Sequence, residues 1–252
     1  MNWPAVPVLS AGAASLCGGV RLHGGLRYNR CILKAATKRE FVPTISSGDD
    51  GAPASPLAYL RAADPVLAAI IDRVGAYAMQ YHEPTFRALV RSIVFQQLHG
   101  KAARAIFDRL QQKAGGEVTP ESILRLRPAQ MRALGLSRQK LTYIRDLARK
   151  TRDGLVEFDK FPQMTDEEVM AELIQVKGIG EWTAHMFLMF ALRRPNILPT
   201  GDYGVRSAMR KAYGMKVMPK PRTMARIAKS WHPYCSVASW YMWRSLDVPV
   251  EL

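Results

Sequence analysis

The chain has 252 residues, 48% of them apolar, with 36 Lys and Arg against 21 Asp and Glu and a net charge of +15. This length supports one large domain or two small ones, and the excess of cations favours a polyanionic partner, nucleic acid before an anionic membrane surface. The scattered cysteines form no Cys-x-x-Cys pair, which excludes a zinc ribbon or four-cysteine iron–sulfur cluster within the chain, and no apolar run reaches the roughly 20 residues that span a bilayer.

Residues 1–55 differ in composition from the rest of the chain. They are rich in Gly, Ala, Ser and Pro, show no clean period, and contain no acid before Glu40. We interpret them as a disordered basic extension ending in a linker, with an organellar transit sequence as the alternative. The remaining domain, residues 56–252, carries 30 cations against 18 acids, a net charge of +12.

From Pro56 onward, apolar residues recur at helical spacing and start signals precede several of the runs. Asp64 precedes Pro65, Thr119 precedes Pro120, and Thr165 with Glu168 has the pattern of a capping box. The expected helices cover residues 65–74, 86–95, 101–112, 128–134, 137–150, 165–176, 181–192 and 203–213. Because few segments alternate with period two, the sequence predicts an all-α fold.

The stretch VKGIGEW interrupts this helical pattern with two glycines. We expect a tight turn in which Gly178 and Gly180 can adopt positive φ angles, which glycine tolerates, while Ile179 packs between the helices. Backbone N–H groups at the start of the second helix, with Lys177 beside them, would then bind a phosphate. An ordinary helical hairpin is the alternative.

A second basic unit, GLSRQK, lies earlier in the chain. Its glycine turn is followed by a helix whose first residues include Arg138 and Lys140, which we interpret as further DNA contacts. Two such units in a basic domain favour duplex binding over a merely solvated charged face.

Asp202 follows a proline-rich loop and precedes the helix expected over 203–213. An aspartate there is well explained as a helix N-cap. The same position also holds a carboxylate as a fixed anion, which suits a transition state that develops positive charge, such as an oxocarbenium ion.

The combination of LIQVKGIGEWTA with the later LPTGDYGVR resembles the helix–hairpin–helix DNA glycosylases, and within them the DNA-3-methyladenine glycosylase II branch. The resemblance runs from about Pro65 to Leu246. It implies two helical subdomains with the active-site cleft between them. The central subdomain would cover about residues 86–192, and the flanking N- and C-terminal helices would form the other.

The resemblance also implies roles for individual residues. Asp202 would stabilise the sugar cation and assist water attack, and Trp182, Met186 and Trp243 would line the base pocket. The hairpin residues Lys177, Gly178, Ile179 and Gly180 would hold a DNA phosphate, and a monovalent cation would bind the carbonyls of Val176 and Ile179. The wedge that enters the duplex gap would be Gln96, Gln97, Leu98 and His99.

The implied reaction is hydrolysis of the N-glycosidic bond of an alkylated base flipped out of duplex DNA. Members that also nick DNA place a lysine where this chain has Trp182, and an indole cannot form an imine, so a monofunctional enzyme is expected. A bifunctional glycosylase/lyase and a non-catalytic DNA-binding module remain the alternatives, and an RNA-binding protein is a third.

The expected partner is double-stranded DNA containing alkylated bases, bound by a monomer without a membrane partner or a required cofactor. The expected compartment is the cytoplasm in a bacterium, and the nucleus or an organelle in a eukaryote.

Overall fold

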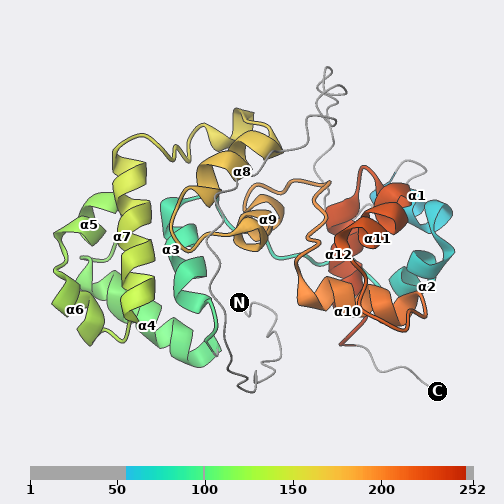
Figure 1. Ribbon diagram of the computed structural model, residues 1–252, viewed down its shortest axis with the longest axis horizontal. Coiled ribbons are helices and arrows are strands. Elements are labelled where there is room, and N and C mark those ends of the chain that lie inside the picture. Colours follow the sequence, from blue (N-terminus) through green and yellow to red (C-terminus); the bar gives the residue numbers. More distant parts are fainter. Residues whose placement is uncertain (1–54, 99, 248–252) are drawn as a thin grey trace, which may run out of the picture. The chain divides into compact units, whose positions relative to one another are not determined.

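The computed structural model describes residues 55–98 and 100–247, so the expectation for residues 1–54 lies outside the described part. Within these ranges the chain forms twelve α-helices and two short 3-10 helices, without a β-strand (Figure 1). Among the described residues, no helix is both long and apolar enough to cross a membrane. The all-α prediction is confirmed for this part of the chain.

The helix boundaries follow the start signals in the sequence. The helices are α1 (Pro56–Ala63), α2 (Pro65–Val74), α3 (Phe86–Phe95), α4 (Gly100–Lys113), α5 (Pro120–Arg125), α6 (Pro128–Ala133), α7 (Arg138–Arg152), α8 (Asp166–Ile174), α9 (Glu181–Phe190), α10 (Tyr203–Ala212), α11 (Pro221–Ile227) and α12 (Cys235–Arg244), with 3-10 turns η1 (Phe161–Gln163) and η2 (Ala228–Trp231).

The capping box before α8 forms as expected. The Thr165 hydroxyl accepts the Glu168 N–H at 3.2 Å, and the Glu168 carboxylate accepts the Thr165 N–H at 2.7 Å. The expected helices 165–176 and 181–192 are each too long at their C-terminal ends, because α8 stops at Ile174 and α9 at Phe190. Ala191 is the C-cap of α9, and Arg193 then adopts a positive φ of 55° although it is not a glycine.

Helices from the beginning and the end of the described chain pack together into one group. Helix α12 packs against α2 and α10, and α1 packs against α2 and η2. Figure 1 shows the early helices α1 and α2 beside α10, α11 and α12. The intervening helices form their own contacts, with α3 against α4 and α7, α5 and α6 against α7, and α8 against α9.

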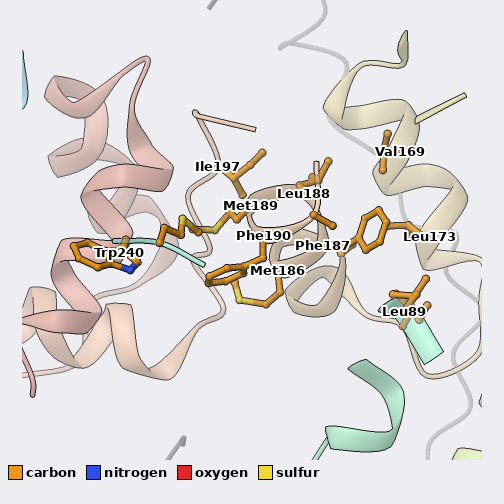
Figure 2. Packing of buried hydrophobic residues seen from close by; sticks show 14 of the residues in the cluster. Leu89, Val169, Leu173, Met186, Phe187, Leu188, Met189, Phe190, Ile197 and Trp240 are labelled. Atoms are coloured by element: carbon orange, nitrogen blue, oxygen red, sulfur yellow. The ribbon is translucent and has the colours of Figure 1, made fainter. Parts of the chain in front are cut away.

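Helix α9 is apolar on most of its surface, as expected for a helix inside the core. Its buried side chains are Thr183, Ala184, Met186, Phe187, Leu188, Met189 and Phe190. In Figure 2, Phe187 points toward Leu173 of α8 and Leu89 of α3, while Met186 and Phe190 lie together on the opposite side of the helix. The core therefore fixes α9, whose N-terminus carries the glycine hairpin.

Candidate active site

Asp202 is the N-cap of α10, and its carboxylate is only 4% exposed. Its Oδ1 accepts the backbone N–H of Val205 at 2.7 Å, the usual capping bond. Oδ1 also accepts the indole N–H of Trp243 at 2.7 Å, and Oδ2 accepts the indole N–H of Trp182 at 2.7 Å. The carboxylate is thus held by three helices, since Trp182 comes from α9 and Trp243 from α12.

Three N–H donors suit an ionised carboxylate, which only accepts hydrogen bonds and has about four lone-pair directions. Oδ1 receives two of these bonds and Oδ2 receives one from the described residues. The arrangement holds an anion in a fixed orientation while leaving acceptor capacity on Oδ2 for a further partner.

Gly204 explains how the Trp243 indole reaches the first turn of α10. A Cβ on Gly204 would lie 2.8 Å from Trp243 Cδ1, closer than real side chains allow, and at a tight 3.1 Å from Asp202 Oδ1. The indole therefore occupies the space that any larger residue would need. This role is not predictable from the sequence, because a glycine two residues after an N-cap gives no signal by itself.

Two of the three predicted base-pocket residues, Trp182 and Trp243, meet at this carboxylate. The half-buried ring of Trp243 stacks on Phe190 with ring centroids 5.8 Å apart and planes 21° apart. Met186 is buried at 3% exposure on the same side of α9 as Phe190, as Figure 2 shows. Both tryptophans thus have a defined role on the Asp202 carboxylate, and stacking on a flipped base stays a prediction.

The glycine hairpin lies between α8 and α9 as a turn that buries Val176 and Ile179 and exposes Lys177, Gly178 and Gly180. Gly178 has a φ of +81°, and a Cβ there would overlap the ring of Tyr143 on α7. Gly180 is the N-cap of α9 and provides no side-chain cap, so the first N–H groups of α9 are available to an anion.

One carbonyl of the predicted cation site already accepts a hydrogen bond. The Val176 carbonyl accepts the Ile179 N–H at 3.0 Å, which closes the hairpin turn. A carbonyl oxygen has two lone pairs, so this bond leaves one for a cation. The cation at the carbonyls of Val176 and Ile179 stays a prediction.

The predicted wedge follows α3 as a turn. Gln97 has a positive φ of 56°, and Leu98 is 39% exposed. The side-chain amide of Gln96 donates to the Gly178 carbonyl at 3.1 Å, so the wedge and hairpin are in direct contact. His99 lies outside the described residues.

The two basic residues predicted to bind DNA differ in their surroundings. Arg138 is exposed at the start of α7. The Lys140 ammonium instead donates to the carbonyls of Val94 and Gln96, each at 2.6 Å. Burial lowers the pKa of Lys140 to about 8. Lys140 therefore caps the C-terminal end of α3, a role the sequence analysis did not anticipate.

Comparisons with known proteins identify the family. The model of the HhH-GPD superfamily of base excision DNA repair proteins matches residues 90–233. The Bacillus subtilis protein YfjP is 31% identical over 188 residues, which is 72% of this chain and 66% of that protein, just under two thirds.

Two solved structures share the fold. The Schizosaccharomyces pombe 3-methyladenine DNA glycosylase Mag1, in complex with abasic DNA, is 31% identical, with a TM-score of 0.66 over 75% of this chain and 94% of that chain. A DNA-3-methyladenine glycosidase from Bacillus halodurans is 33% identical, with a TM-score of 0.69 over 79% of this chain and 97% of that chain. The fold expected from the resemblance is confirmed, and the chain belongs to the HhH-GPD superfamily of base excision DNA repair proteins.

Proposed function

We propose that this protein is a monofunctional DNA glycosylase that hydrolyses the N-glycosidic bond of alkylated bases, of the 3-methyladenine type, flipped out of duplex DNA. It would perform the first step of base excision repair. The names of the related structures and the DNA bound to Mag1 support this assignment. The observation that carries it is the buried Asp202 carboxylate, held by three N–H donors at the start of α10.

The carboxylate supplies an anion for the reaction's cationic transition state. As the bond between C1′ and the base breaks, its electron pair leaves with the base and the sugar becomes an oxocarbenium ion. A negative charge already in place stabilises this ion without reorganisation. The uncommitted lone pair of Asp202 Oδ2 orients a water molecule, which attacks C1′ and releases its proton through the carboxylate to solvent.

An alkylated base suits this site because methylation at a ring nitrogen makes the base cationic. A cationic base leaves as a neutral molecule, so the reaction needs little general acid. It also gains attraction from aromatic faces such as those of Trp182 and Trp243. Met186 stands where the family often has a tyrosine, which makes the pocket less aromatic.

Trp182 distinguishes hydrolysis from lyase chemistry. The resemblance assigns its position to the lysine that forms a Schiff base in bifunctional relatives. An indole has no amine, and here its N–H is bonded to Asp202. The enzyme would therefore leave an intact abasic strand.

The exposed hairpin residues Lys177, Gly178 and Gly180, together with Arg138, would bind the phosphate backbone. Gln97 and Leu98 would enter the gap left by the flipped base. We also propose that the protein acts as a monomer, that it needs no cofactor beyond a monovalent cation at the hairpin carbonyls, and that it works where cellular DNA is repaired.

The direct test incubates the purified protein with methylated duplex DNA and identifies the free bases by chromatography. The expected products are free alkylated purines and a strand that breaks only after alkali treatment. Release of no alkylated base would overturn the proposal, and strand cleavage before alkali would overturn its monofunctional part.

A further inference from the structure

One face of α7 contacts both segments that are predicted to touch DNA. We call it the α7 brace and define it as Lys140, Tyr143, Asp146 and Lys150. These residues are spaced by three, three and four positions, so they form one stripe along the helix. The brace is distinct from the Asp202 site, since none of its members bonds to Asp202 or to either tryptophan.

At one end of the brace, Lys140 holds the wedge. Its ammonium donates to the Val94 and Gln96 carbonyls, each at 2.6 Å. A cation at a helix C-terminus interacts favourably with the helix dipole and with carbonyls that lack helical partners. The residue that follows these carbonyls is Gln97, whose left-handed backbone needs support from its surroundings.

At the other end, three residues hold the hairpin. The Tyr143 ring occupies the space beside Gly178. Asp146, 7% exposed, accepts the Lys177 N–H at 2.9 Å and forms an ion pair with Lys150 at 3.2 Å. Lys150 also donates to the Gln175 carbonyl. Burial raises the pKa of Asp146, but the hydrogen bonds from Lys177 and Lys150 outweigh it, and the pKa is lowered overall.

The wedge and the hairpin, which contact the two ends of the brace, also contact each other directly. The Gln96 amide donates to the Gly178 carbonyl at 3.1 Å, while the Gln96 carbonyl accepts from Lys140. The wedge, the hairpin and α7 therefore form a closed ring of contacts. A shift of either DNA-contacting segment alone would break at least one of these bonds.

Resting on the proposed function, we propose that the α7 brace is a positioning element that holds the wedge and the hairpin in register for base flipping. Because the two segments are held together, binding of a backbone phosphate by the hairpin sets the position along the strand at which the wedge enters. The brace acts on extraction of the base from the duplex and leaves bond cleavage at Asp202 unaffected. Lys140, Tyr143 and Asp146 are thus positioning residues.

The test uses a substrate for which the wedge is unnecessary. Lys140→Met removes the donors while keeping the length of the side chain. Because the substitution removes charge-assisted hydrogen bonds to two carbonyls, single-turnover base release from a methylated duplex is expected to fall about tenfold or more. Release from the same oligonucleotide as a single strand is expected to stay within about threefold, since no base has to be unstacked.

A fluorescent 2-aminopurine placed next to the lesion reports unstacking without depending on cleavage. At saturating protein, Lys140→Met is expected to give a smaller fluorescence rise than the wild type. Lys140→Arg, which keeps charge and donors, is expected to restore both the rise and the duplex activity. Arg149→Met is the matched control, because it removes an exposed cation from α7 whose side chain forms no hydrogen bond or ion pair with the described residues of either segment.

Equal losses on duplex and single strand would show that Lys140 only supports the fold, and would overturn the proposal, as would an unchanged fluorescence rise. If Lys140→Met does not fold, Asp146→Asn at the other end of the brace is measured with the same two substrates and must show the same duplex-specific loss. A wild-type protein that releases no base from either substrate overturns the proposed function itself, and this proposal with it.

Discussion

Two buried aspartates of this protein have nearly the same local structure. Asp64 caps α2 and Asp202 caps α10, at 7% and 4% exposure. Asp64 Oδ1 accepts the N–H groups of Val66 and Leu67, at 3.0 and 3.1 Å. Its Oδ2 accepts the Tyr213 hydroxyl at 2.6 Å and the Trp231 indole N–H at 2.9 Å. Each carboxylate thus combines capping with an indole donor.

The two carboxylates differ in how many further hydrogen bonds their oxygens can accept. Asp64 has four donors, two on each oxygen, and its tryptophan is fully buried. Asp202 has three, with a single donor on Oδ2, and both of its tryptophans are only partly buried. Burial, capping and an indole bond are therefore shared by both carboxylates and do not distinguish the proposed catalytic one. Asp202 differs from Asp64 in the acceptor capacity left on Oδ2 and in its partly exposed aromatic rings, so we assign Asp64 a structural role.

Among the effects on stability, the largest is expected at Asp64. Asp64→Asn keeps one capping oxygen but turns an amide N–H₂ toward the Trp231 N–H, leaving a buried donor without an acceptor. This is expected to lower the free energy of unfolding by about 2–3 kcal/mol. Urea denaturation measures it, and the exposed Asp72→Asn is the control, with an expected loss of at most about 1 kcal/mol. Equal losses of unfolding free energy for the two variants would show that the buried hydrogen bonds of Asp64 stabilise the fold no more than those of an exposed aspartate.

Trp182→Phe tests the hydrogen bond that the Trp182 indole donates to Asp202. It keeps an aromatic ring but removes the donor to Oδ2, so the rate of base release is expected to fall about tenfold, as for the loss of a hydrogen bond to a charge. Single-turnover kinetics measure it. Trp240→Phe makes the same change on α12 without touching Asp202, and its rate should stay near that of the wild type. A wild-type rate for Trp182→Phe would show that this bond is irrelevant to the reaction.

A smaller effect is expected at Gly204. A methyl group there must displace the Trp243 indole, which weakens its bond to Oδ1, and base release is expected to fall about three- to tenfold. Gly201→Ala in the loop that precedes α10 is the control, because nothing lies within 4 Å of its added Cβ. If the two variants have equal rates, the position of Trp243 does not matter to the reaction.

The smallest effect concerns pH. The pKa of Asp146 is lowered in the folded protein, so its stabilising contribution is present above its ordinary pKa and is lost as pH falls through the lowered value. The stability difference between wild type and Asp146→Asn should therefore shrink as pH falls below about 4. Urea denaturation over that range checks this. A constant difference would mean that the charge of Asp146 does not stabilise the hairpin.

Much of this was predictable from the sequence, because the signals are local. The Thr165 cap, the glycine hairpin and Asp202 at the start of α10 each follow from a few neighbouring residues, and the family resemblance assigned Trp182 and Trp243 to the same site. Tertiary contacts carry no such signal. The approach of Trp243 to Gly204, the contact of Tyr143 with Gly178, and the capping of α3 by Lys140 join residues far apart in the chain.

Lys140 shows the limit most clearly. A lysine in the first turn of a basic helix is typical of a phosphate contact, and the sequence analysis interpreted it that way. In the structure the ammonium is bonded to two backbone carbonyls. Only the position of α3 beside α7 decides between these roles, and that position depends on the packing of the whole core.

We propose that Asp202 acts on the reaction and that Asp64 acts on the fold. The most direct measurement compares single-turnover release of methylated bases by folded Asp202→Asn and Asp64→Asn under saturating protein, with duplex affinity measured in parallel. Asp202→Asn is expected to bind the duplex but to lose about a hundred- to a thousandfold in release, as for removal of a charge-stabilising group, while Asp64→Asn is expected to release bases at the wild-type rate. Release by Asp202→Asn at the wild-type rate would contradict this proposal.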